Sequence, residues 1–185
     1  MRDPAMAGRG IRHRPWLSWV AVTTAGWLVG GALGSVAGYG GTGGASGALV
    51  VAGGAVAAGI GQWLVLRRAI DHAVLWLVAT VAAVPIVAGL VVAIEPLDWG
   101  SAVALGGFAL GVTQWVVLRR HARRASLWIL ASAAGWIAGG LLRGATAPPA
   151  GWVVIGVTYG VVTGTALVLL LSDAARTTTA GHAGA

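Results

Sequence analysis

The sequence predicts an all-α integral membrane protein of six transmembrane helices, arranged as three tandem helical hairpins. Hydrophobic residues make up 57% of the 185 residues and charged residues only 9%, whereas soluble chains carry roughly a quarter charged residues. Apolar segments without a charged side chain follow one another along the chain. In addition, one segment recurs at a spacing of 52 residues, which indicates a copied unit.

Six segments approach the ~20 apolar residues that a helix needs to cross ~30 Å of hydrocarbon. They are residues 16–38, 48–66, 73–94, 101–118, 127–142 and 152–171. Glycine-rich or proline-containing turns separate the outer ends of these segments at 39–44, 95–98 and 147–151. The predicted organisation is therefore a basic N-terminal segment 1–15, a membrane domain 16–171 with hairpins 16–66, 73–118 and 127–171, and a disordered tail 172–185.

The distribution of arginine predicts the orientation. All twelve basic side chains are Arg, and with six spans eleven of them fall on one side of the membrane. Only Arg143 falls on the other side. Because cytoplasmic loops carry the excess of basic residues, both termini are predicted to be cytoplasmic. A cleaved signal peptide is the alternative for the N-terminus, but the first apolar stretch is long and contains Trp19 and Trp27.

The hairpins are predicted to be copies of one unit. Residues 61–68 match 113–120 at a spacing of 52, and residues 164–171 match at 51 but lack the Gln, the Trp and both Arg. Three tryptophans begin the odd-numbered spans: Trp19, Trp76 and Trp128. A two-helix unit returns the chain to its starting side, so the copies are parallel and related by a pseudo-threefold axis along the membrane normal.

The repeated segment also carries a resemblance. Positions 59–68 and 111–120 both contain Gly-x-x-Gln-Trp-x-Val-Leu-Arg. In this motif the chain resembles a group of uncharacterised bacterial multi-pass membrane proteins that repeat the same segment. The resemblance implies a multi-pass protein of the bacterial inner, or plasma, membrane. It implies no activity and no cofactor.

Two glutamines are the strongest polar signals within the spans. Gln62 and Gln114 each lie five residues before an Arg pair, which places them about 7.5 Å deeper than the headgroups. The favoured interpretation is an interhelical hydrogen bond, because an unpaired amide is costly in hydrocarbon. The other interpretation is a polar vestibule open to the cytoplasm, in which Thr165 holds the corresponding position of the third copy.

Small residues and arginines complete the candidate positions. Glycines at four-residue spacing are predicted to let helices pack closely: Gly26, Gly30, Gly107, Gly111, Gly135, Gly139, Gly156, Gly160 and Gly164. Arginines that follow the second and fourth spans are candidates for binding anionic lipid headgroups: Arg67, Arg68, Arg119, Arg120, Arg123 and Arg124. Since these Arg lie between apolar spans, lipid phosphates are the predicted partners rather than nucleic acid.

The sequence predicts no enzyme. It contains no Cys, no catalytic or phosphate-binding motif, and no His, Asp or Glu spacing typical of a metal site. The leading hypothesis is a non-enzymatic membrane protein with a structural, scaffold, accessory or lipid-associated role, for which a protein partner or a second copy is a candidate. The alternative is a small transporter or channel for a neutral or apolar solute, with Gln62 and Gln114 lining a central path. Ion-coupled transport is disfavoured, because no ionisable residue lies within a span.

Overall fold

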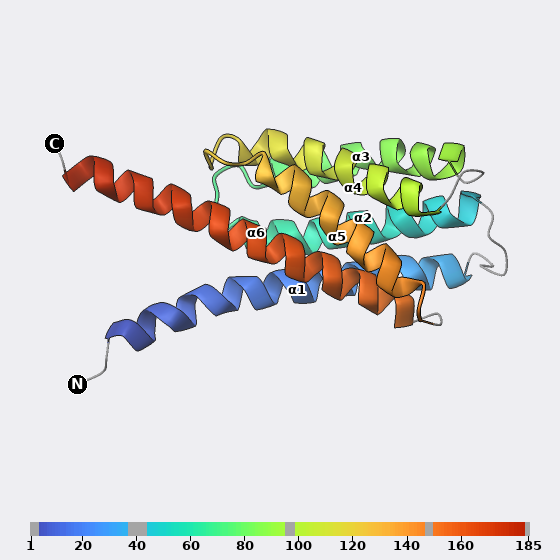
Figure 1. Cartoon of the computed structure of the whole chain (residues 1–185), viewed down its shortest axis with the longest axis horizontal. Coiled ribbons are helices and arrows are strands. Elements are labelled where there is room, and N and C mark those ends of the chain that lie inside the picture. The colour runs from blue at the N-terminus through green and yellow to red at the C-terminus, as the bar shows by residue number, and fades with distance from the viewer. Residues whose placement is uncertain (1–3, 37–43, 95–98, 147–149, 184–185) are drawn as a thin grey trace.

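In the computed structural model, the described residues are 4–36, 44–94, 99–146 and 150–183. This part of the chain forms six α-helices and no strand (Figure 1). The helices are α1 Pro4–Val36, α2 Gly44–Leu66, α3 Val74–Ile94, α4 Trp99–Leu118, α5 Leu127–Arg143 and α6 Ala150–Ala183. The prediction of an all-helical chain with six helices is therefore confirmed for these residues. The predicted turns at 39–43, 95–98 and 147–149 lie outside them.

The helices form a closed ring. Each helix packs against the helix before it and the helix after it, and α6 returns to pack against α1. Within the described ranges no other pair of helices brings its backbones close together. The interior of the ring is consequently filled by side chains rather than by a central helix.

The two terminal helices are longer than the sequence predicts. The tail 172–185 is predicted to be disordered, but α6 continues to Ala183. Similarly, α1 begins at Pro4, within the predicted N-terminal segment. Ala and Arg are strong helix formers, and the run Ala174-Ala175-Arg176 follows the apolar part of α6 without Gly or Pro. This run favours continuation of the helix beyond the apolar part.

Helix α1 begins and helix α6 ends at one end of the ring, where the α2–α3 and α4–α5 connections also lie (Figure 1). We call this end the arginine end. Helices α2 and α4 end there, directly before Arg67 and Arg119. Helices α1, α3 and α5 end, and helices α2, α4 and α6 begin, at the opposite end (Figure 1).

The outer surface of the ring is apolar. Three described helices contain segments long and apolar enough to cross a membrane, namely Pro15–Val36, Leu49–Leu66 and Ala150–Ala174. The apolar stretches of the others are shorter, at Val74–Leu90, Ala104–Leu118 and Leu127–Arg143. Each of the six exposes large hydrophobic side chains, for example Leu33, Ile60, Ile86, Phe108, Leu130 and Val157. Water solvates such a surface poorly.

The glycines named above lie where helices touch. All nine are buried, and at each of them a Cβ atom would lie against a neighbouring helix. At Gly26 it would overlap the backbone of Ala58, and at Gly139 it would come within 3.2 Å of the Ile155 Cα. Gly89 differs, because a Cβ there would meet nothing within 4 Å.

Candidate functional site

Three tryptophans meet in the interior near the arginine end, and we call them the tryptophan triad. Trp19, Trp76 and Trp128 come from α1, α3 and α5, and each is at most 1% exposed. Their ring centroids are 5.6 Å apart for Trp19 and Trp76, 5.9 Å for Trp19 and Trp128, and 5.2 Å for Trp76 and Trp128. All three pairs are edge-to-face, an arrangement that aromatic quadrupoles favour. The triad fills the interior at this level.

Each glutamine joins the helices on its two sides. On α2, the Gln62 Oε1 accepts a bond from the Trp76 Nε1 (3.1 Å), and its Nε2 donates to the Thr23 Oγ1 (3.0 Å). On α4, the Gln114 Oε1 accepts from the Trp128 Nε1 (3.1 Å), and its Nε2 donates to the Thr80 Oγ1 (3.0 Å). Gln62 is 2% exposed and Gln114 is 1% exposed. Both ends of each amide are therefore paired within the protein.

Helix α6 has no glutamine and uses two residues instead. The Trp19 Nε1 donates to the Thr163 Oγ1 at 3.0 Å, which links α6 to α1. The hydroxyls of Tyr159 and Ser132 lie 3.1 Å apart, which links α6 to α5. Ser132 also donates to the carbonyl of Gly107 at 2.9 Å. Thr163 and Tyr159 together therefore join α6 to both neighbouring helices, as a single glutamine does on α2 and on α4.

These bonds form a hydrogen-bond belt around the ring. At least one side-chain bond crosses each of the six interfaces between neighbouring helices, and the belt consists of these six: Gln62–Thr23, Trp76–Gln62, Gln114–Thr80, Trp128–Gln114, Ser132–Tyr159 and Trp19–Thr163. The Thr80 hydroxyl further donates to the Trp76 carbonyl. Buried polar groups are costly unless they are paired. The belt pairs them while holding every neighbouring pair of helices together.

Thr165 lies outside this belt, and the glycine contacts explain why. Three glycines make equivalent contacts with the next odd-numbered helix. A Cβ atom added to any of them would meet the residues that lie one and four positions after the triad tryptophan of that helix. These glycines are Gly59, Gly111 and Gly160. By these contacts Gly160 corresponds to Gly111 at a spacing of 49 residues, not the predicted 51, so Thr163 rather than Thr165 lies where the glutamines lie. Thr165 is exposed, donates to the Val161 carbonyl and accepts a bond from Trp16.

Sequence reasoning overlooked five residues of the belt. Three of them, Thr23, Thr80 and Ser132, each follow a triad tryptophan by four residues, so they share its helix face. That repeated Trp-x-x-x-Thr/Ser spacing was the available signal. The fourth, Tyr159, has no polar counterpart on α2 or α4, and nothing in the sequence distinguishes it. The fifth, Thr163, was missed because Thr165 was aligned with the glutamines instead.

A second aromatic cluster lies beyond the triad, away from the arginine end. Trp27 and Trp136 pack edge-to-face at 5.1 Å, Trp152 stacks on Trp27 at 6.3 Å, and Tyr159 lies at 6.3 Å from Trp136. The indole N–H groups of Trp27 and Trp136 are buried and have no hydrogen-bond acceptor among the described residues. These two tryptophans are held by packing alone.

The six candidate lipid-binding arginines are all exposed. Two of them, directly after the end of a helix, lie over a tryptophan four residues earlier in its last turn. The Arg67 guanidinium is 5.9 Å from the Trp63 ring, and the Arg119 guanidinium is 5.2 Å from the Trp115 ring. Because such cation–π contacts leave guanidinium N–H groups at the edge of the plane, these arginines can still bind an anion.

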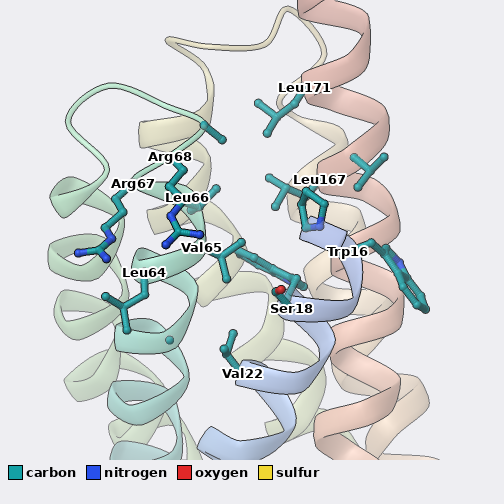
Figure 2. A pocket seen from close by; sticks show the side chains of 16 residues that line it. Trp16, Ser18, Val22, Leu64, Val65, Leu66, Arg67, Arg68, Leu167 and Leu171 are labelled. Carbon is teal, nitrogen blue, oxygen red and sulfur yellow. The ribbon is translucent and has the colours of Figure 1, made fainter. Parts of the chain in front are cut away.

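A cleft of about 830 Å³ opens at the arginine end between α1, α2 and α6. Figure 2 shows Arg67 and Arg68 on one side of it and Leu167 and Leu171 of α6 on the other. Most of its lining residues are apolar. Gln62, Gln114 and Thr165 line neither this cleft nor two smaller cavities of about 330 and 230 Å³.

Among the described residues, no three His, Cys, Asp or Glu side chains come together in a way that could hold a metal ion. No family model, no curated protein and no solved structure matches the chain. The function is therefore inferred from the geometry of the chain itself.

Proposed function

We propose that the chain spans the bacterial inner membrane six times with both termini in the cytoplasm. The apolar outer faces on all six helices support this, because lipid is the solvent that such a continuous surface requires. The shorter helices are members of the same ring as the longer ones. The shortest, α5, has 17 residues, which gives a length of about 25 Å. Modest bilayer thinning accommodates a span of that length.

The same proposal includes three parallel hairpins around a pseudo-threefold axis. It is supported by the edge-to-face triad, one ring from each odd-numbered helix, and by glutamines that make the same two bonds on α2 and α4. A repeat of two spans leaves successive copies in the same orientation.

Within this membrane the chain acts as a non-enzymatic scaffold that associates with anionic lipids, and it conducts no solute through its centre. The hydrogen-bond belt carries this conclusion. A central path would have to pass the triad, whose rings touch one another, and the glutamine amides are already paired on both sides. Opening that path would break several buried bonds at once. The exposed arginines at the cytoplasmic end are suited to phosphate headgroups.

Solute flux in proteoliposomes tests the scaffold against the transporter. Vesicles holding the purified chain should take up glycerol and urea no faster than protein-free vesicles, as measured by stopped-flow light scattering after an osmotic step. The double variant Gln62→Leu, Gln114→Leu should give the same rates. Flux well above the empty vesicles in the native chain, abolished in a folded double variant, would instead establish the channel. A known glycerol channel serves as the positive control.

A further inference from the structure

The cleft at the arginine end makes the ring asymmetric. It lies beside the first hairpin, and the corresponding groove beside the second hairpin is only about 330 Å³, against about 830 Å³ for the cleft. Both contain an arginine at the same position of their even-numbered helix, Arg68 in the cleft and Arg120 in the groove. The difference in volume therefore comes from the other residues that line the cleft and the groove.

Two substitutions between the copies widen the cleft. Ser18 on α1 occupies the place that Leu75 occupies on α3, one residue before the triad tryptophan. Gly61 on α2 occupies the place of Thr113 on α4, one residue before the glutamine. Leu75 and Thr113 line the small groove, and Ser18 and Gly61 line the cleft. Ser18 and Gly61 are smaller and leave space in the cleft, whereas Leu75 and Thr113 fill the equivalent space in the groove.

A third difference comes from α6. In the register set by the glycine contacts, Gly164 and Val168 of α6 occupy the places of the Trp63–Arg67 pair on α2 and the Trp115–Arg119 pair on α4. Both Gly164 and Val168 line the cleft. The third copy thus presents a smooth apolar wall where the other two copies place an indole and a guanidinium.

We propose that this cleft binds one anionic phospholipid, with an acyl chain against the α1 and α6 walls and its phosphate at Arg67 and Arg68. The volume lies within the roughly 300–1,000 Å³ typical of small-ligand sites. The charge is complementary, because both charged residues of the lining are arginines and none is acidic. Guanidinium groups bind phosphate oxygens through paired N–H bonds. The inference rests on the proposed membrane location and lipid association, and it adds a single defined site.

The apolar wall selects an intact lipid over a free phosphate. Leu64, Val65, Leu167 and Leu171 contribute only hydrocarbon to the cleft, and hydrocarbon binds an acyl chain but contributes nothing to an inorganic ion. A headgroup alone would make the arginine contacts and leave the walls uncovered.

Native mass spectrometry of the full chain, released from detergent with phosphatidylglycerol present, tests the site. The native chain should retain one phosphatidylglycerol more tightly than phosphatidylcholine. The double variant Arg67→Gln, Arg68→Gln should weaken this retention by about fivefold for each arginine, the equivalent of ~1 kcal/mol for a basic residue near lipid. Ser18→Leu should also weaken it, by filling the cleft with the side chain of the second copy. Both variants must elute as the native chain does in size exclusion.

The matched comparison is Arg119→Gln, Arg120→Gln, which removes the same charges beside the small groove. Its loss of retention should be smaller than that of the Arg67 and Arg68 variant. Equal losses in the two double variants, or full retention in Ser18→Leu, would overturn the single site while leaving general lipid association intact. No preference for phosphatidylglycerol in the native chain would overturn both.

Competition separates lipid from phosphate. Single-chain lysophosphatidylglycerol should displace the bound lipid, and chain-free glycerophosphoglycerol at the same concentration should not. Equal displacement by the two would contradict a role for the apolar walls, and the cleft would then be an anion site only.

Discussion

At the scale of single residues, the interior holds tryptophans of two kinds that differ at the indole N–H. In the triad, the N–H of Trp76 donates to Gln62 and that of Trp128 to Gln114. In the second cluster, the N–H groups of Trp27 and Trp136 have no acceptor among the described residues. Both kinds are almost fully buried. The two kinds of tryptophan are therefore buried to a similar extent, and they differ in whether the indole N–H makes a hydrogen bond.

Replacing one tryptophan of each kind by phenylalanine isolates that bond. Trp76→Phe leaves the Gln62 Oε1 buried without its donor, whereas Trp27→Phe removes an N–H that bonds to nothing described. Since both lose the same volume, Trp76→Phe should lower the free energy of unfolding by about 1–2 kcal/mol more. Unfolding by SDS titration in mixed micelles measures the difference. Equal costs would show that the belt contributes no net stability.

The sequence indicated the glutamines but not the whole belt. Gln62 and Gln114 are conspicuous, because an amide in hydrocarbon needs partners, and the favoured interpretation as interhelical bonds agrees with their contacts. The sequence match of residues 164–171 with 113–120 is two residues away from the register that the contacts of α6 show. Two residues rotate a helix position by about 200°, which explains why Thr165 is exposed and Thr163 buried. A run of small and apolar residues offers no unique alignment.

At the scale of helices, close approach depends on glycine at particular places. Gly26 on α1 lies directly against the backbone of Ala58 on α2, which cannot rotate away as a side chain would. Periodicity predicts such faces, since residues four apart share one side of a helix. The predicted glycines accordingly lie at interfaces. Helix ends were predicted less well, because the continuation of α6 depends on propensity after the apolar pattern ends.

A pair of alanine substitutions tests the close approach. Gly26→Ala should push α1 and α2 apart and cost about 1–3 kcal/mol, as overpacking does. Gly89→Ala, where a Cβ meets nothing within 4 Å, should be neutral or stabilise α3 by up to ~1 kcal/mol through helix propensity. Melting temperatures in the same detergent measure both. A Gly26→Ala chain as stable as Gly89→Ala would contradict the packing seen between α1 and α2.

At the scale of the whole molecule, one helix of the ring differs from the others that carry the belt. Helix α6 lacks the glutamine, the tryptophan and the Arg pair of α2 and α4, and the belt still closes through Thr163 and Tyr159. The cleft beside α1 is lined by Ser18 and Gly61 of α1 and α2 as well as by Gly164 and Val168 of α6. The belt therefore closes without a glutamine on α6, whereas the open cleft depends on residues of all three helices. A comparison of the segments in the sequence shows which residues α6 lacks but neither of these consequences.

The membrane topology of the ring can be tested directly. Arg67, Arg68 and the four arginines of the α4–α5 connection lie at the end where α1 begins and α6 ends. By the excess of basic residues in cytoplasmic loops, reporter fusions after residue 70, after residue 122 and at the C-terminus should report cytoplasm. Fusions near Gly43, Pro96 and Pro149 should report the periplasm. The shorter helices decide the outcome, because a chain that crossed only through α1, α2 and α6 would cross three times and place its C-terminus outside. Alkaline phosphatase activity from the C-terminal fusion would therefore reject the six-span ring.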